Sequence, residues 1–525
     1  MALGKYLLLP FGPPGWVGFG LCVAHERAQD KALRRETLQK TFSYQPTPIY
    51  GQHWALDEEI KRAGRFRREG SLVGLSLQSN REIFSGLKSP NRISVSATSG
   101  GKTTLVAGAM LNNSLMGSSL FIPEVAGELA YLAGDFRRRC GSTFRLDPYD
   151  IAPLPGLTRA FYDVMRLDWL NPRSKYFWPR SAKLSSLAIS KGSARDPYWS
   201  LKSRAGLQFA IMAVRKYCDP RLAKLPLVAQ IVCDDLPGFA KYIMRRCDDP
   251  AIAALGAPWA NPHAEEIRSL NEVIENLRAE LAFLLDPAVA EVLSYRPNFA
   301  PASMRHEVQT AFALLPGELM DGPVSKFLGL ITGCCFAETM RPDPLARVEL
   351  QTILDEMFVL NLENLPLLFA TSRKFHVSIW GLIQDFAELK QMTDKTFSTV
   401  LGNSGTLQIM GIGVGDQDGA ELVSKALGDT EVFATNKSLS YRVGKPQNDP
   451  DYVPEWAELQ QISVQESHSQ QRRRFMLPEE AVALDPTLQI CWLQGVSAPV
   501  LCRKAPYYQT SAKWRAQRNP LLRGK

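Results

Sequence analysis

Residues 92–104 read Arg-Ile-Ser-Val-Ser-Ala-Thr-Ser-Gly-Gly-Lys-Thr-Thr, and this stretch decides the fold class. The stretch Arg92–Ala97 predicts a strand, a glycine-containing loop follows, and a helical pattern runs from Thr104 to Asn113. Strand, loop and helix in this order are the context of a Walker A motif, whose backbone N–H groups cradle a polyphosphate at a helix N-terminus. Ser96 stands where the motif usually has its first glycine, and we expect it to alter the start of the loop.

The motif assigns chemistry to the residues of this phosphate-binding loop, which comprises residues 96–103. A lysine at the position of Lys102 contacts the β- and γ-phosphates, and a hydroxyl at the position of Thr103 holds Mg²⁺. ATP and Mg²⁺ are therefore the predicted cofactors. The residues predicted to bind the nucleotide are Thr98, Ser99, Gly100, Gly101, Lys102, Thr103 and Thr104.

Two pairs of polar residues follow apolar runs further along the chain. Asp355-Glu356 comes after Val348–Leu354, and Gln384-Asp385 comes after Val377–Ile383. In P-loop ATPases an aspartate so placed completes the Mg²⁺ shell, and a neighbouring glutamate activates the attacking water. We therefore predict that Asp355 is a metal ligand and Glu356 a catalytic residue, and that Gln384 senses the γ-phosphate. Either pair alone also fits an ordinary solvated strand end.

Short apolar runs that alternate with helical patterns predict a mostly parallel sheet. The runs are Arg92–Ala97, Ser119–Ile122, Thr143–Asp147, Val308–Leu315, Val348–Leu354, Val377–Ile383, Thr406–Ile412, Leu488–Leu493 and Pro499–Arg503. Between them, helical periodicity without a strand pattern marks Leu201–Tyr217, Pro226–Cys247 and Glu265–Leu285. The sequence thus predicts an α/β, RecA-like P-loop NTPase with a central, mostly parallel sheet and an all-α insertion domain.

The domain boundaries follow from these patterns and from a length of 525 residues, which suits two or three domains. We expect an apolar N-terminal segment with a linker at 1–45, a nucleotide-binding domain at 46–190 and 301–445, and a helical domain at 191–300. A polar linker, C-terminal strands and a basic tail would occupy 446–525. Tyr6–Ala24 has no charge over 19 residues, but its prolines and glycines oppose a helix. It either spans a membrane or packs irregularly on the protein or at the membrane surface.

The composition, 45% hydrophobic and 22% charged, excludes a disordered or fibrous chain. Nine scattered cysteines without a C-x-x-C pair indicate reduced thiols and offer no metal framework. The net charge of +8 is concentrated locally. The basic clusters are Arg62, Arg65, Arg67 and Arg68, then Arg137–Arg139, Arg472–Arg474 and the tail Ser511–Lys525. They fit either phosphate contacts with nucleic acid or solvated surfaces.

Taken in order, the motifs resemble those of the conjugative coupling ATPases of type IV secretion, the TraG/TraD-like family within the FtsK/HerA group of motors. The resemblance extends from about Tyr50 to Pro520. It rests on Gly51-Gln52-His53-Trp54-Ala55, Ala97–Thr103, Ser119–Asp147, Asp196-Pro197-Tyr198-Trp199, Ile353–Glu356, Ile383-Gln384-Asp385 and Arg474–Tyr508. The chain departs from the family at Ala126, where a lysine is usual, and in its short N-terminal part, where two membrane helices are usual.

The resemblance implies a homohexameric, Mg-ATP-driven motor at the cytoplasmic face of the bacterial inner membrane. Such a motor links relaxase-bound DNA to the subunits of the secretion channel and moves single-stranded DNA through its centre. Its helical domain is implied to recognise cargo, and Arg373 is our first candidate for an arginine finger. Two alternatives stay open: a cargo-recruiting adaptor with weak or no hydrolysis, and a motor that exports protein effectors.

Overall fold

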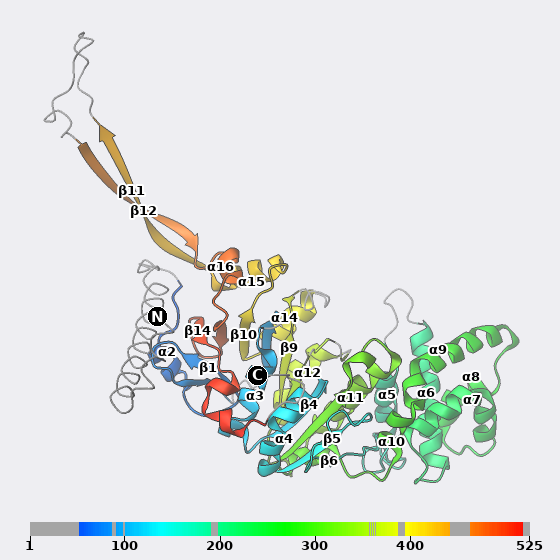
Figure 1. The fold of residues 1–525 in the computed structure, drawn as a ribbon. Helices are drawn as coiled ribbons and strands as arrows, with labels where there is room; N and C mark the ends of the chain where they lie inside the picture. The colour runs from blue at the N-terminus through cyan, green and yellow to red at the C-terminus, as the bar shows by residue number, and fades with distance from the viewer. Residues whose placement is uncertain are drawn as a thin grey trace. The chain divides into compact units, whose positions relative to one another are not determined.

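The computed structural model describes residues 52–86, 91–97, 100–190, 198–355, 357–358, 360, 362, 364–386, 394–441 and 462–517. These residues fall into two compact units, one made of 55–420 and 481–517, the other of 52–54 and 421–480. Figure 1 shows the course of the chain. Among the described residues, no helix combines the length and the apolar composition that a bilayer span needs, and Tyr6–Ala24 lies outside them.

A 12-stranded sheet runs through the larger unit in the order β2-β1-β14-β13-β10-β3-β9-β8-β4-β7-β5-β6. Its strands are β1 Leu72–Ser76, β2 Glu82–Phe84, β3 Arg92–Ser96, β4 Ser119–Val125, β5 Ser142–Leu146, β6 Thr158–Arg159, β7 Gln309–Leu315, β8 Leu350–Leu354, β9 Val377–Ile383, β10 Thr406–Gly411, β13 Leu488–Leu493 and β14 Val500–Arg503. All neighbours from β10 to β6 are parallel, whereas the pairs from β10 to β2 are antiparallel. The predicted α/β class with a mostly parallel sheet is confirmed.

Helices cover the parallel part of this sheet, and β3 and β8 are buried along their whole length although they contain polar residues. Every residue of β7 is buried. The helices α3 (Lys102–Met110) and α4 (Glu128–Cys140) share one core cluster with the sheet. Leu105, Met110, Leu132 and Phe136 from the helices belong to it, as do Leu120, Phe312 and Trp380 from the strands. This core fixes α3, and with it the start of the predicted phosphate site.

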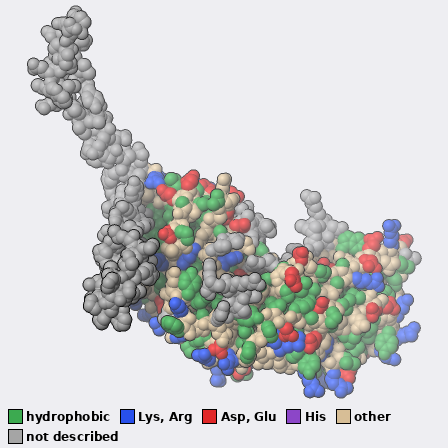
Figure 2. Space-filling model, in the orientation of Figure 1, with side chains coloured by type: hydrophobic (Ala, Val, Ile, Leu, Met, Phe, Trp, Pro, Cys, Tyr) green, Lys and Arg blue, Asp and Glu red, His purple; other side chains and the backbone are tan. Residues whose placement is uncertain are grey.

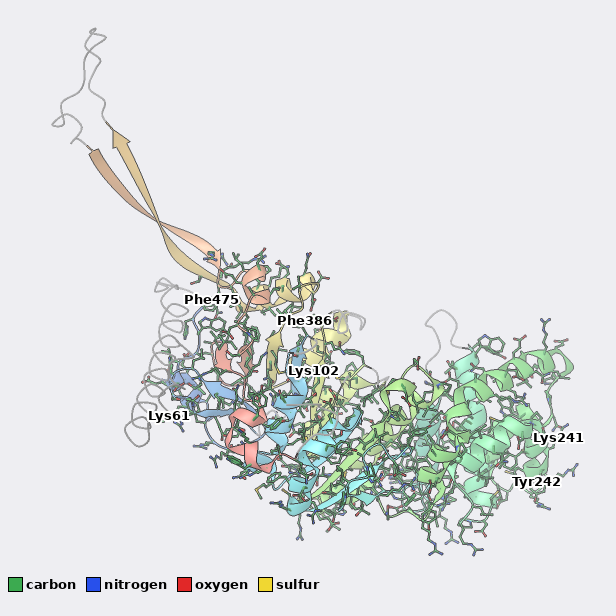
Figure 3. All side chains as sticks on the ribbon, in the orientation of Figure 1. Lys61, Lys102, Lys241, Tyr242, Phe386 and Phe475 are labelled. Carbon is green, nitrogen blue, oxygen red and sulfur yellow. The ribbon has the colours of Figure 1, made fainter. Side chains whose placement is uncertain are left out.

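The described residues between β6 and β7 contain helices and no strand. The helices are α5 Phe177–Ala188, α6 Tyr198–Tyr217, α7 Leu225–Met244, α8 Pro250–Ala260, α9 Ile267–Leu285 and α10 Pro287–Ser294. Close packing joins α6 to α8, because a Cβ at Gly206 would lie 2.6 Å from the Trp259 ring. α7 is kinked before Pro237, since Asp235 is non-helical and its carboxylate accepts the Gly238 N–H at 2.8 Å. Figure 3 marks Lys241 and Tyr242 on the second half of α7.

The smaller unit contains a long hairpin. Its strands β11 (Asp429–Tyr441) and β12 (Ile462–Arg474) pair antiparallel along their whole length. Arg474 joins the hairpin to Glu421 of α15 (Gln417–Leu427) through ion pairs of 2.5 and 2.8 Å. Residues 462–474, which we expected within a polar linker, therefore form a strand through their pairing with β11.

Several arginines of the predicted basic clusters have internal partners. Arg137 is fully buried and donates to the carbonyls of Leu115 and Ser118 at 2.8 and 2.6 Å. Arg138 and Arg139 both pair with Asp135. Figure 2 shows basic and acidic side chains mixed over the visible face. The Arg137–Arg139 cluster thus serves packing and local ion pairs, and gives no support to a nucleic-acid contact there.

Candidate nucleotide-binding site

Three neighbouring strands bring the predicted site residues to one edge of the sheet. β9 lies between β3 and β8 and is parallel to both, with Val95 opposite Ile383 and Leu354 opposite Gly381. The carboxyl ends of parallel strands meet at the same edge, where α/β proteins bind their ligands. The phosphate-binding loop after β3, Gln384 after β9 and Asp355 after β8 therefore lie along this edge, although they are far apart in sequence.

The described part of the loop has the geometry of an anion site. The Gly100 N–H donates to Ala97 O at 2.9 Å, and Gly101 precedes α3 with a φ of 93°. Glycine adopts this left-handed conformation without strain. The loop therefore delivers the chain into α3, whose first N–H groups have no partner within the helix and attract anions. Of the predicted nucleotide-binding residues, Gly100 to Thr104 surround this helix start, and Thr98 and Ser99 lie outside the described residues.

Lys102 is the first residue of α3 and is half-buried (Figure 3). Among the described residues it has no carboxylate partner within ion-pair distance. An ammonium placed at a helix N-terminus without a countercharge suits a site that receives an anionic ligand. The placement of Lys102 therefore fits its predicted role.

Ser96 replaces the first glycine of the motif without strain, because it is the last residue of β3 and its φ is not positive. Its side chain is buried, and its hydroxyl donates to Ala97 O at 3.2 Å. The hydroxyl occupies space that a Cβ at Gly100 would need, since such a Cβ would lie 2.2 Å from the Ser96 Oγ. Ser96 and Gly100 are thus a matched pair.

Ser96→Gly is accordingly expected to leave ATP turnover within about twofold of the parent protein, because the strand does not depend on this side chain. Gly100→Ala should weaken nucleotide binding, because its Cβ would also lie 2.9 Å from Ala97 O. Steady-state ATP hydrolysis and MgADP titration of both variants test the pair. Equal losses in both variants would contradict this account.

The acidic and amide groups of the site follow β8 and β9 directly. Asp355 and Gln384 are half-buried, and Glu356 lies outside the described residues. The chain after Gln384 is anchored, because the Asp416 carboxylate accepts the N–H of Phe386 at 3.0 Å and that of Gly419 at 2.8 Å. This anchor fixes the end of β9 between the loop and Asp355.

One buried carboxylate near the site was missed at the sequence level. Glu124 lies near the end of β4, the neighbour of β8, and accepts the N–H groups of Leu129 and Ala130 at 2.9 Å each. Burial raises the pKa of Glu124 to about 8, although the two hydrogen bonds lower it. The charge of Asp355 adds to the rise. The pattern that predicted Asp355, an acidic residue at the end of a mainly apolar strand, could also have identified Glu124.

Arg373, our arginine-finger candidate, is exposed and precedes β9 in the sequence. Because β9 runs from Val377 to Ile383, Arg373 lies at the strand end opposite to Gln384. The arginine is therefore remote from the phosphate-binding loop of its own chain.

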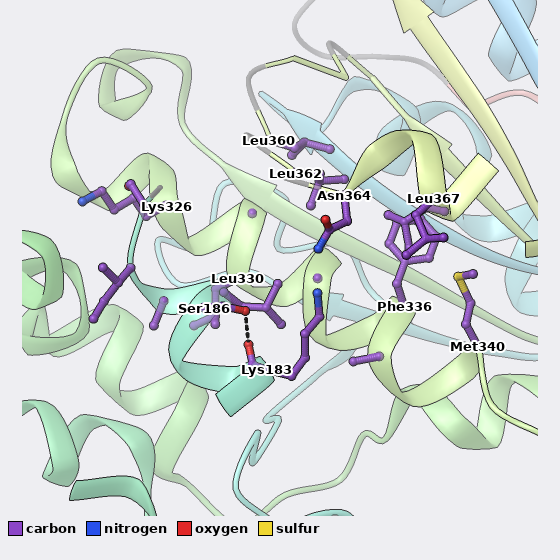
Figure 4. Close-up of a pocket in the computed structure, with 18 of the residues that line it drawn as sticks. Lys183, Ser186, Lys326, Leu330, Phe336, Met340, Leu360, Leu362, Asn364 and Leu367 are labelled. Atoms are coloured by element: carbon purple, nitrogen blue, oxygen red, sulfur yellow. Dashed lines mark hydrogen bonds between the residues drawn. The ribbon is translucent and has the colours of Figure 1, made fainter. Parts of the chain in front are cut away.

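A cavity of about 430 Å³ lies beside the helices α5, α11 (Lys326–Thr339) and α12 (Leu365–Thr371). Its walls are mainly apolar, and Lys183 and Asn364 approach it from two sides (Figure 4). Leu360 and Leu362, which follow Asp355 in the chain, line it as well. None of the described residues of the phosphate-binding loop lines it, so this cavity is distinct from the nucleotide edge.

Comparisons with known proteins agree with this geometry. Residues 349–486 match the family model described as the TraM recognition site of TraD and TraG. No curated protein sequence matches the chain. Among solved structures, the bacterial conjugative coupling protein TrwBdeltaN70 in its unbound form is 15% identical with a TM-score of 0.62, covering 89% of this chain and 96% of that chain.

Two further TrwB structures hold nucleotides. The complex with ADP and Mg²⁺ is 14% identical with a TM-score of 0.63, covering 87% of this chain and 94% of that chain. The complex with the ATP analogue ADPNP is 13% identical with a TM-score of 0.63, covering 88% and 95%. The resemblance noted in the sequence is thereby confirmed. The chain has the fold of a conjugative coupling protein and, over residues 349–486, matches the model of the TraM recognition site of TraD and TraG.

Proposed function

We propose that this chain is an ATP-hydrolysing coupling protein of a type IV secretion or conjugation system. The observation that carries the proposal is the meeting of the phosphate-binding loop, Gln384 and Asp355 at the ends of three adjacent parallel strands. TrwB, which shares the fold, has been solved with ADP and Mg²⁺ and with an ATP analogue. The geometry of the strand ends and the TrwB complexes both support nucleotide binding at this edge of the sheet.

The residues fit Mg-ATP by their chemistry. The Thr103 hydroxyl and the Asp355 carboxylate are oxygen donors of the kind that Mg²⁺ prefers. Bound Mg²⁺ would neutralise charge on the phosphates. Lys102 would hold the β- and γ-phosphates, and Glu356 would orient a water molecule and take its proton during in-line attack. Gln384, between loop and metal ligand in the strand order, would report the presence of the γ-phosphate.

The cargo follows from the type of protein that the chain resembles. We propose that it recruits relaxase-bound DNA, with residues 191–300 as the recognition domain, and pumps single-stranded DNA to the channel. The active form would be a homohexamer at the inner membrane, in which Arg373 acts on the nucleotide of a neighbouring subunit. The match over residues 349–486 supports a partner within the DNA-processing complex.

ATP hydrolysis by the full chain, with and without single-stranded DNA, tests this function. Turnover that rises with single-stranded DNA is the expected result. Nucleotide binding without turnover would favour the adaptor, and turnover indifferent to DNA would favour a motor for protein effectors. A chain that binds no nucleotide would overturn the proposal.

A further inference from the structure

A lysine from near the C-terminal end of the described chain contacts the phosphate-binding loop. Lys504 follows β14, and its ammonium donates a hydrogen bond to Gly100 O at 3.0 Å. Its backbone N–H donates to Thr487 O at 2.8 Å, which ties the residue to the start of β13. None of the roles discussed above is assigned to Lys504.

The contact between Lys504 and Gly100 O also determines the direction of the next N–H group. A trans peptide is planar, so its C=O and N–H point in opposite directions, and the described residues contain no cis peptide. By holding Gly100 O on one side, Lys504 turns the N–H of Gly101 to the other. Neither residue has a side chain that restricts rotation of this peptide. The lysine therefore supplies an orientation that the loop sequence itself does not enforce.

The electrostatics of the position favour a bound anion. The Lys504 ammonium lies beside the N-terminus of α3, where the partial positive charge of the helix opposes another cation. Burial lowers the pKa of Lys504, whereas the Asp485 carboxylate raises it. A polyphosphate at the loop would compensate this charge. A charged donor on Gly100 O also polarises the peptide and strengthens the Gly101 N–H as a donor.

The segment that carries Lys504 is firmly packed along α3. Ala505 is buried, and its carbonyl lies so close that a Cβ at Gly108 would approach it to 2.7 Å. Further along, Arg515 donates to Leu111 O, at the C-terminal end of the same helix, at 2.9 Å. Two cations of one segment thus hold backbone carbonyls at both ends of α3.

We propose that Lys504 is a positioning residue of the nucleotide site, which orients the Gly100–Gly101 peptide so that the Gly101 N–H faces the bound phosphates. The inference rests on the proposed binding of ATP. Because Lys504 contacts the backbone of the loop at Gly100 O, it should act on nucleotide affinity rather than on the chemical step.

Lys504→Met in the full chain tests this role, because methionine keeps the apolar stem and removes the donor. We expect MgADP to bind about tenfold more weakly and the KM for ATP to rise in step, since a charged hydrogen bond is lost. We expect kcat to stay within about threefold. The conservative variant Lys504→Arg should bind MgADP about as tightly as the parent protein, because a guanidinium can donate to the same carbonyl. Arg515→Met, which loses a comparable bond at the other end of α3, is the matched control and should bind MgADP normally.

Each outcome separates the two proposals. If Lys102→Ala weakens MgADP binding while Lys504→Met binds normally, the role of Lys504 is overturned and the proposed function stands. Equal weakening by Lys504→Met and Arg515→Met would also overturn it, because general loosening of α3 would suffice. If the parent protein binds no MgADP, the proposed function fails and this inference fails with it. Should Lys504→Met not fold, the same titrations with Lys504→Gln decide.

Discussion

Lys102→Ala is expected to lower the kcat of ATP hydrolysis by about 10²–10³-fold, as for loss of one group that stabilises transition-state charge. The residue begins α3, directly after Gly101, where the phosphates of a bound nucleotide would lie. No other described residue of the phosphate-binding loop carries a positive side chain. Steady-state hydrolysis with saturating Mg-ATP measures the effect, both with and without single-stranded DNA.

A control separates chemistry from folding. Lys241, an exposed lysine of α7, offers a matched Lys241→Ala variant that should keep full turnover (Figure 3). The unfolding transition of Lys102→Ala should coincide with that of the parent protein, because the half-buried ammonium has no described carboxylate partner. Undiminished hydrolysis by Lys102→Ala would show that the Walker A residues do not perform the reaction.

Arg166→Met should have the largest effect on stability. Arg166 forms a two-pronged ion pair with Glu338 of α11, and the Tyr162 hydroxyl donates to the same carboxylate at 2.6 Å. The Glu338 side chain is only 1% exposed, against 11% for Arg166. Removing the cation leaves a buried, uncompensated carboxylate, so we expect the free energy of unfolding to fall by about 3–5 kcal/mol. Urea denaturation of the full chain measures it.

The loss of stability in Arg166→Met should depend on pH. Burial raises the pKa of Glu338, and the attraction of Arg166 opposes that rise. Without Arg166 the pKa rises further, so the folded protein keeps a proton that the unfolded chain releases. The stabilisation from that proton is complete at low pH and is lost as the pH climbs through the raised pKa. Arg166→Met should therefore be more destabilising at about pH 8.5 than at about pH 5.5.

Two comparisons test the assignment. Arg166→Met combined with Glu338→Met should recover most of the stability, because no unpaired charge remains. Arg221→Met, which removes an exposed pair with Asp219, should not change unfolding measurably. A double variant no more stable than Arg166→Met alone would refute the role of the buried charge.

The sequence predicts most strands of the parallel core because each is a short stretch rich in apolar and β-branched residues that lies between helical patterns. β1 was missed for a long-range reason. Gly74 interrupts its apolar pattern, yet a Cβ there would lie 2.4 Å from the Gln489 amide and 2.7 Å from Arg503 O. The requirement comes from β13 and β14, more than 400 positions away in the chain. Local patterns do not contain such information.

The predicted site shows the same division. The sequence predicts Lys102, Thr103, Asp355 and Gln384 as site residues by type and spacing, and each follows a strand that ends at the same edge of the sheet. Lys504 has no such signal, since its contact with Gly100 O arises only when β14 joins the sheet. Arg137 shows the opposite case: within a run of three arginines it fitted either a nucleic-acid contact or a solvated surface, yet it is completely buried. Burial of a cation depends on carbonyls that the fold gathers around it.

The strand order also constrains how the protein is made. β1 and β2 are among the first strands to leave the ribosome, yet β1 reaches the rest of the sheet only through β14, the last of the described strands. Until β13 and β14 emerge, β1 and the outer edge of β10 have open hydrogen-bonding edges. Pairing between such distant segments is slow. These open edges expose the nascent chain to aggregation until synthesis is nearly complete. A C-terminal truncation before residue 503 would remove pairing residues of β14 and leave the edge of β1 open permanently.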